Sequence, residues 1–299
     1  MKNPSELNKR ISSGFSNRDK LREEKIWKIL MLGSLAIVIG SLIMVVGVII
    51  WNGAPALTFS MITQTPKGGY YLGKEGGILN AIVGSLYLAF GSVILALIIS
   101  LPAALSLQKD YIGKTKLAYY IRLSLDVLWG TPSIVYGAFG FIVMLYFGLR
   151  ASLLGGIIVL TVLQLPIMIR SMEEVIKMVP NDLKEASYSL GATRFETTAR
   201  VVIRQALPGI VTAVILAFGR GIGDAASILF TAGYTDSLPR SLLDPVASLP
   251  LAVFFQLGTP FPEVQQRAYA SALILLIIVL ALSITSRYLS RKFMKNIIR

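Results

Sequence analysis

Residues 181–208, NDLKEASYSLGATRFETTARVVIRQALP, are the longest polar, helix-forming stretch between two hydrophobic spans of this chain. Asn181 is a suitable N-cap residue, and Gly191 tolerates the left-handed backbone that ends many helices. Thr193 and Glu196 have the T-x-x-E spacing of a capping box, which starts another helix. The stretch therefore predicts a helix, a sharp turn at Gly191, and a second helix that leads into the next span.

The composition is typical of a membrane protein. Hydrophobic residues make up 54% of the 299 positions and charged residues 15%, whereas soluble domains have about 25% charged residues. The chain has no Cys and no His, which excludes disulfides, Cys/His zinc sites and a histidine base. A net charge of +13 would suggest nucleic acid in a soluble protein. In a membrane protein it indicates cytoplasmic loops, so no nucleic-acid partner is expected.

Six apolar stretches approach or exceed the length of roughly 20 residues that crosses a bilayer as a helix. They are residues 29–51, 79–107, 128–148, 153–169, 207–230 and 268–284. The third and fourth are joined by only a few residues around Arg150, which predicts a tight helical hairpin. We therefore predict an all-α membrane protein with six transmembrane helices in one domain, residues 29–287.

The distribution of Lys and Arg predicts which side of the membrane each loop faces. If the N-terminus is inside, the inside segments 1–28, 108–122, 170–204 and 287–299 carry 8, 4, 6 and 5 of the 29 Lys and Arg, whereas the outside loops carry five. This asymmetry follows the positive-inside rule. We therefore predict that both termini are cytoplasmic. The resulting layout has a cytoplasmic N-terminal segment 1–28, external loops 52–77 and 231–266, a cytoplasmic loop 170–206, and a cytoplasmic tail 288–299.

Two short motifs resemble nucleotide-binding turns but lack the required context. The stretch Gly68–Glu75 nearly matches GxxxxGK[ST], but Glu75 lacks the hydroxyl that would coordinate Mg²⁺. The glycines at 219, 221 and 223 follow a membrane helix rather than a strand, so a dinucleotide turn is not expected. Gly219 and Gly223 have the GxxxG spacing of close helix packing instead. No catalytic residue, cofactor or metal site is predicted.

Arg220 and Asp224 are charged residues inside the predicted fifth span. Such residues are costly in a membrane and usually face a cavity or a partner. Four positions apart, they would share one helical face. They could therefore serve a translocation pathway or its gating, or form a purely structural ion pair. Pro132 and Pro166 also lie within predicted spans, where they would kink the helices for bending or for packing.

Several segments carry a family resemblance. Glu185-Ala186-Ser187, followed by Gly191, resembles the EAA-x₃-G motif of ABC importer permeases, although Ser187 stands in the place of the second alanine. Three further segments are similar to phosphate permeases of that class. They are TPSIVYG at 131–137, residues 219–233, and DPVASLP at 244–250. In one of them Asp224 stands where the family usually has Glu. The ending FTA at 230–232 favours the A-type over the C-type subunit.

The resemblance implies a type I ABC importer permease (MetI-like) fold in a bacterial cytoplasmic membrane. It implies that Glu185, Ala186, Ser187 and Gly191 dock on a separate ATP-binding subunit, so this chain would not be an enzyme itself. The other partners implied are a homologous permease subunit, a second ATP-binding subunit and an external phosphate-binding protein.

Three alternatives remain open. One is an ABC permease for another oxyanion or small solute, such as sulfate or an amino acid. The second is a stand-alone secondary transporter or channel, which often shows internal repeats that this sequence lacks. The third is a non-transport assembly factor, which would not need Arg220 and Asp224 within the membrane.

Overall fold

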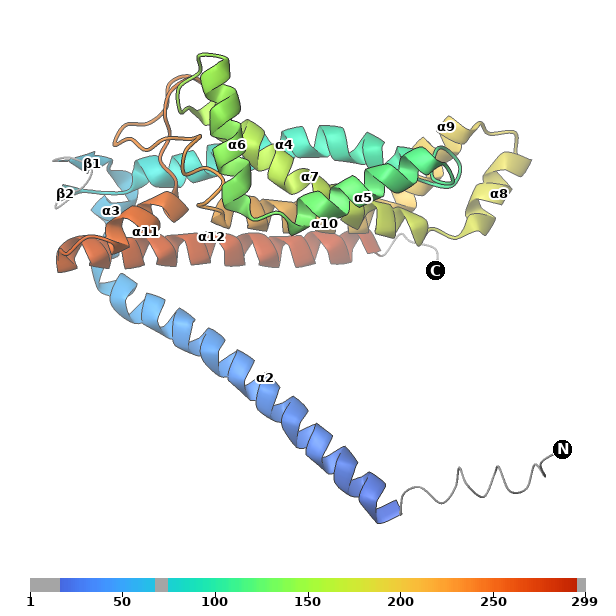
Figure 1. Ribbon diagram of the computed structural model, residues 1–299, viewed down its shortest axis with the longest axis horizontal. Helices are drawn as coiled ribbons and strands as arrows, with labels where there is room; N and C mark the ends of the chain where they lie inside the picture. Colours follow the sequence, from blue (N-terminus) through green and yellow to red (C-terminus); the bar gives the residue numbers. More distant parts are fainter. Residues whose placement is uncertain (1–16, 68–74, 295–299) are drawn as a thin grey trace. The chain divides into compact units, whose positions relative to one another are not determined.

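The computed structural model describes residues 17–67 and 75–294 (Figure 1). The start of the predicted N-terminal segment, most of the Gly68–Glu75 motif and the last five residues of the tail lie outside the described residues. The described part is helical apart from a short antiparallel hairpin, β1 (Pro66–Lys67) with β2 (Glu75–Gly76). The chain divides into two compact units, residues 1–51 and 52–299.

The first unit consists mainly of helix α2, Asn17–Gly53, which contains the predicted first span. Its large apolar side chains are mostly exposed, and none of its most apolar window is buried within the chain. A helix of 37 residues that is apolar on all sides is expected to contact lipid or other protein helices.

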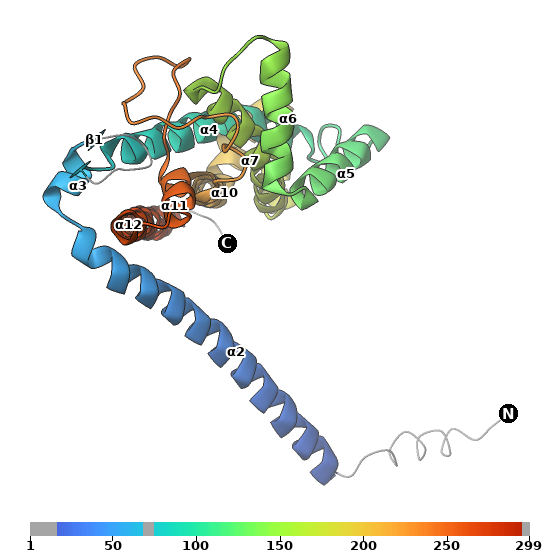
Figure 2. The same ribbon diagram turned by 60° about the vertical axis from the view of Figure 1, so that its left-hand side comes forward.

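The second unit contains the remaining helices. They are η1 (Ala54–Ala56), α3 (Phe59–Thr63), α4 (Leu79–Ser106), α5 (Lys116–Gly130), α6 (Ser133–Tyr146), α7 (Leu153–Lys177), α8 (Asn181–Ser189), α9 (Arg194–Thr197), η2 (Thr198–Val202), α10 (Ile203–Gly223), α11 (Leu249–Leu257) and α12 (Pro262–Met294). Helix α10 packs against α4, α7 and α12, and all four run side by side (Figures 1 and 2). The core between them contains Ala89, Ala96, Ala213 and Ala217, each at most 1% exposed. Small residues let membrane helices approach closely.

The predicted third span, residues 128–148, is wrong as a single helix. Helices α5 and α6 meet at an angle of 103° (Figure 1). Thr131 has extended backbone, with φ −77° and ψ 130°, because the ring of Pro132 disfavours helical backbone in the residue before it. Five other helices have the length and composition to cross a membrane, and the bent pair passes the same test only when its two helices are counted as one broken span. Residues 147–152 connect α6 to α7, which pack against each other.

The predicted fifth span also ends earlier than expected, because α10 stops at Gly223 rather than reaching residue 230. The following apolar residues form turns, and their backbone packs against α6 and α7. A Cβ at Gly137 of α6 would lie 2.7 Å from the carbonyl oxygen of Ser227. Irregular backbone is tolerated at membrane depth where protein buries it, and the glycines of α6 and α7 provide that space.

The buried turns bring together the three segments that resemble phosphate permeases. The Val246 N–H donates to the Ala232 carbonyl at 2.9 Å, which joins the segments 244–250 and 219–233. Gly137 of the segment 131–137 packs directly against the same turns. Helix α11 follows, and its Leu249 and Leu251 are fully buried. The predicted fourth and sixth spans are parts of longer helices, α7 and α12.

Candidate functional site

Helices α8 and α9 carry the candidate coupling residues. Pro180 occupies the N-cap position of α8, so the predicted N-cap at Asn181 is wrong and Asn181 is the first helical residue. The extended ψ of Pro180, 136°, places it outside the helix. Gly191 has φ +82°, the left-handed conformation predicted for the turn. Its N–H donates to the Tyr188 carbonyl at 2.9 Å, which closes the end of α8.

The predicted capping box at the start of α9 is confirmed. The Glu196 N–H donates to the Thr193 hydroxyl at 3.3 Å, and the Thr193 N–H donates to the Glu196 carboxylate at 2.9 Å. The next turn, η2, is a π-helix that leads directly into α10. The turn at Gly191 and this box therefore set the path from α8 into a membrane helix.

The outer side of this segment is exposed and partly apolar. Glu185 and Ala186 are exposed, whereas Ser187 is half-buried and its hydroxyl lies 2.9 Å from the Thr197 hydroxyl. Leu190 is 89% exposed and Phe195 is 76% exposed. We call residues 181–197 the α8–α9 segment.

The loop between α4 and α5, residues 107–115, braces the α8–α9 segment. Asp110 accepts from the buried Lys184 ammonium of α8 at 2.9 Å. The carbonyl of Asp110 accepts from Arg194 of α9 at 3.2 Å. The Tyr111 hydroxyl lies 2.9 Å from the Thr198 hydroxyl at the start of η2. The α8–α9 segment is therefore joined to this loop as well as to α7 and α10.

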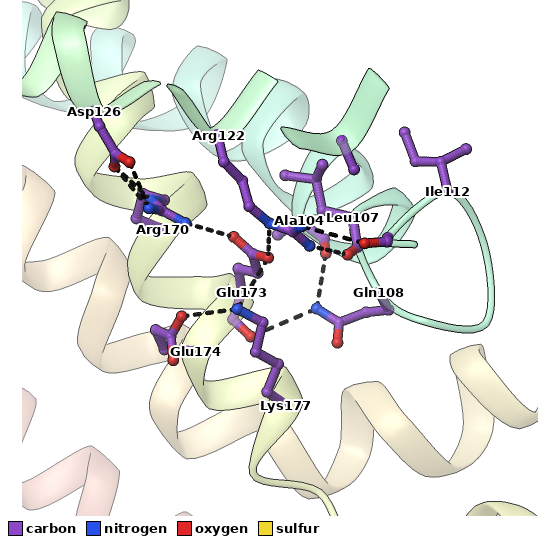
Figure 3. A network of polar contacts seen from close by, with 12 residues as sticks. Ala104, Leu107, Gln108, Ile112, Arg122, Asp126, Arg170, Glu173, Glu174 and Lys177 are labelled. Carbon is purple, nitrogen blue, oxygen red and sulfur yellow. Dashed lines mark hydrogen bonds and ion pairs between the residues drawn. The ribbon is translucent and has the colours of Figure 1, made fainter. Parts of the chain in front are cut away.

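A buried carboxylate near the end of α7 forms ion pairs with three cationic side chains (Figure 3). Glu173 is 0% exposed, and its Oε1 atom lies 2.7 Å from Arg122 Nε and 3.1 Å from Lys177 Nζ. Its Oε2 atom lies 3.3 Å from Arg170 Nη1. A buried charge needs such partners to offset its loss of hydration. Helix α7 continues eight residues beyond the predicted end of its span at residue 169, and Glu173 and its partners Arg170 and Lys177 lie on this extension.

The same network ties α7 to the neighbouring elements. Arg122 of α5 also donates to the carbonyls of Leu107 and Gly113, at 2.7 and 3.2 Å. Arg170 binds both carboxylate oxygens of Asp126 in a two-pronged pair (Figure 3). Such pairs fix geometry as well as adding energy. The end of α7 is thus joined to both α5 and the 107–115 loop, immediately before α8 begins.

Arg220 and Asp224 lie at the other end of α10 and do not share a helical face. Arg220 is exposed in the last turn, whereas Asp224 is the C-cap residue, with extended backbone. The Asp224 carboxylate accepts the Ser227 N–H at 2.9 Å and so stabilises the first buried turn. Within residues 17–67 and 75–294, Arg220 forms no ion pair. Gly219 and Gly223 face open space, so the GxxxG packing predicted for them does not occur among the residues that the structure describes.

The two prolines occupy different positions. Pro132 lies in the break between α5 and α6 and caps the start of α6. Pro166 is buried within α7, which continues through it as one helix. The sharp change of direction therefore lies at Pro132.

Comparison with known proteins gives the family. A family model described as the binding-protein-dependent transport system inner membrane component matches residues 96–295. The chain belongs to this family. It is 31% identical to the probable ABC transporter permease protein YqgI of Bacillus subtilis, covering 89% of this chain and 95% of that protein.

Other relatives in this family of permeases are named phosphate transport system permease proteins. One is PstA 2 of Mycobacterium tuberculosis, 31% identical, with 90% of this chain and 89% of the relative covered. Another is PstA of Yersinia pestis, 32% identical, with coverage of 81% and 80%.

Solved importer structures share the fold of this inner-membrane permease. The MetNI methionine ABC transporter in an inward-facing conformation has a TM-score of 0.60 at 20% identity, covering 72% of this chain and 95% of that one. A bacterial ABC transporter that imports the acidic polysaccharide alginate has a TM-score of 0.60 at 12% identity, with 92% and 98% covered. These likenesses confirm the predicted MetI-like fold. The inner-membrane family and the apolar helices confirm the multi-pass membrane location.

Sequence reasoning missed the network around Glu173 in this permease. Arg170, Glu173 and Lys177 have i,i+3 and i,i+4 spacings, which place their side chains together on a helix. The predicted span ends at residue 169, so these residues fall in the predicted cytoplasmic loop. Arg122 lies 51 positions away from Glu173, and no local pattern links the two.

Proposed function

We propose that this chain is the transmembrane subunit of an ATP-driven phosphate importer and forms half of its translocation pathway. The observation that carries the proposal is the 31–32% identity, over 81–90% of the chain, to permeases named for phosphate transport. The helical domain supplies the membrane part, and the α8–α9 segment supplies an exposed surface for a partner. Substrate identity rests on these relatives and not on a phosphate site built from this chain.

The energy source in this proposal is a separate ATP-binding subunit that docks on the α8–α9 segment. Glu185, Ala186 and Gly191 would contact it, and the exposed Leu190 and Phe195 would add apolar area at the contact. Ser187, through its contact with Thr197, would hold the two short helices together. In this proposal the chain acts as the permease, and its partner hydrolyses ATP.

The force then has two routes into the membrane. One is direct, because the α8–α9 segment continues through η2 into α10. The other uses the Asp110–Lys184 contact to the 107–115 loop and the Glu173 network to α5 and α7. Together these contacts would make the cytoplasmic ends of the helices move as a unit when the ATP-binding subunits close.

The exposed end of α10 is our candidate for the translocation pathway. Arg220 presents an unpaired guanidinium within the described part of the chain, and its planar fork suits an oxyanion. Gly219 and Gly223 leave open space beside it. A homologous permease subunit would supply the facing half. Asp224 would hold this end of α10 through its turn and so contribute to gating.

The complete importer would contain two permease subunits, two ATP-binding subunits and an external phosphate-binding protein. Its substrate is tested by ATP-dependent uptake in proteoliposomes that hold the full assembly. We expect uptake of radiolabelled phosphate that unlabelled phosphate suppresses and excess sulfate does not. Uptake of sulfate or an amino acid in place of phosphate would support a permease for another solute.

A further inference from the structure

A basic cavity lies between the 107–115 loop, the end of α7 and the first two turns of α8. Its volume is about 610 Å³, within the usual range of roughly 300–1,000 Å³ for small-molecule sites. The cavity is lined by five cationic and two acidic residues, together with neutral polar and loop residues. The cationic residues are Lys109, Lys114, Arg122, Lys177 and Lys184, and the acidic residues are Asp110 and Glu185.

The lining cations divide into paired and unpaired groups. Arg122 and Lys177 lie against Glu173, and Lys184 lies 2.9 Å from Asp110. By contrast, Lys109 and Lys114 are exposed and form no ion pair with any residue that the structure describes. Two ammonium groups therefore line the cavity without a protein partner.

Neutral hydrogen-bonding groups complete the lining. Asn181 and Tyr188 of α8 also line the cavity, and their side chains carry an amide and a hydroxyl. Glu185 also lines it, but this exposed side chain lies on the surface that we assign to the ATP-binding subunit, so its carboxylate can point towards that partner. An oxyanion in the cavity would thus be near the ammonium groups of Lys109 and Lys114 and two neutral side chains that can donate hydrogen bonds. The exposed Glu185 carboxylate is a nearby group that would repel it.

The cavity lies where an anionic membrane surface is expected. The count of Lys and Arg predicts that this end of the helices is cytoplasmic. Tyr119 and Tyr120, on the first turns of α5, are 63% and 61% exposed, and such aromatic residues are enriched at the membrane–water interface. Basic pockets at the cytoplasmic ends of membrane helices commonly bind phosphate headgroups.

We propose that this cavity binds a phosphate group, supplied by the headgroup of an anionic phospholipid or by free inorganic phosphate. The ligand would contact the 107–115 loop through Lys109 and Lys114, and α8 through Asn181 and Tyr188. It would therefore hold α8 against the loop that already braces it through Asp110. The site is separate from the exposed end of α10, and the proposal does not depend on which solute is transported.

The test compares K109Q, K114Q and their double variant with K116Q in the assembled transporter. Lys116 is also exposed and follows the same loop, but it does not line the cavity, so K116Q is the matched loss of one charge. One arm counts phosphatidylglycerol retained by the purified transporter, using native mass spectrometry. The other arm measures equilibrium binding of radiolabelled inorganic phosphate in a neutral detergent.

For whichever of the two probes is the ligand, K109Q and K114Q should each weaken binding about fivefold, since a lysine near an anionic surface contributes about 1 kcal/mol. The double variant should weaken binding roughly thirtyfold. K116Q should change binding by less than about twofold, because its charge acts only at a distance through screening salt. A lipid response alone identifies the headgroup, and a response to inorganic phosphate alone identifies the free ion. Binding of neither probe to the wild type, or equal losses in K116Q and K109Q, would overturn the proposal. So would a double variant that binds both probes normally but loses the ATP-binding subunit.

Discussion

Replacing Glu173 by Gln should destabilise the membrane domain far more than the same change at its neighbour Glu174. Glu173→Gln removes the negative charge on which Arg122, Arg170 and Lys177 converge, while preserving the size of the side chain. Glu174 is 66% exposed at its side chain and contacts Lys177 at 2.9 Å. The two variants therefore lose the same charge from adjacent positions of one helix.

The magnitude follows from the burial of each partner. Removing one member of a fully buried ion pair costs about 3–5 kcal/mol. The side chains of Arg122, Arg170 and Lys177 are 25%, 23% and 39% exposed, so they can regain some hydration, and we take about 3 kcal/mol for Glu173→Gln. An exposed pair contributes at most about 1 kcal/mol, which is the limit for Glu174→Gln.

Thermal unfolding of the purified transporter in detergent measures both variants. A change of 1 kcal/mol shifts the unfolding midpoint by about 2–4 °C in domains of 150–250 residues, so we expect a fall of roughly 6–12 °C for Glu173→Gln. For Glu174→Gln the fall should stay below about 4 °C. Equal shifts in the two variants would refute the role of Glu173 as the charge that holds α5 to α7.

Four further predictions concern the other sites. Arg220→Gln should abolish phosphate uptake while the complex still assembles, because the guanidinium would face the pathway; wild-type uptake would remove Arg220 from it. Glu185→Lys should reduce the amount of ATP-binding subunit that co-purifies with the chain, and an unchanged ratio would argue against docking on the α8–α9 segment. Gly191→Ala should destabilise the fold by about 1–2 kcal/mol in thermal unfolding, since left-handed backbone is costly for a residue with a Cβ; Gly219→Ala, which meets open space, is its control and should have little effect. Burial raises the pKa of the Asp236 carboxyl, so the fold loses stability as the pH rises from the usual aspartate pKa through the raised value. Asp236→Asn should therefore raise the unfolding midpoint at neutral pH but not below the usual aspartate pKa of about 3.9. A difference between variant and wild type that does not change with pH would contradict this cause.

Features with a cause within a few residues could be predicted from the sequence. The left-handed turn at Gly191 and the capping box of Thr193 and Glu196 depend on local backbone chemistry. The membrane spans depend on composition averaged over about 20 residues, so the five unbroken spans and their order could also be predicted. The residues at which the spans end were harder to predict, because hydropathy does not distinguish a helix from buried turns. The apolar residues after Asp224 are an example.

Features that depend on distant contacts could not be predicted in the same way. The sharp corner before Pro132 had a local signal in the Thr131-Pro132 pair, but the apolar run across it suggested one span. The pairing of Glu173 with Arg122 requires the fold that brings α5 to α7. The brace between Asp110 and Lys184 likewise joins residues 74 positions apart. A count of charges locates such residues on one side of the membrane without revealing their partners.

We propose that this permease moves phosphate only when a separate ATP-binding subunit drives it. The direct test is uptake of radiolabelled phosphate into proteoliposomes, comparing this chain alone with the complete assembly, with and without ATP. We predict ATP-dependent uptake by the complete assembly and none by the chain alone. Phosphate flux through the chain alone would contradict the account and would favour a stand-alone transporter or channel.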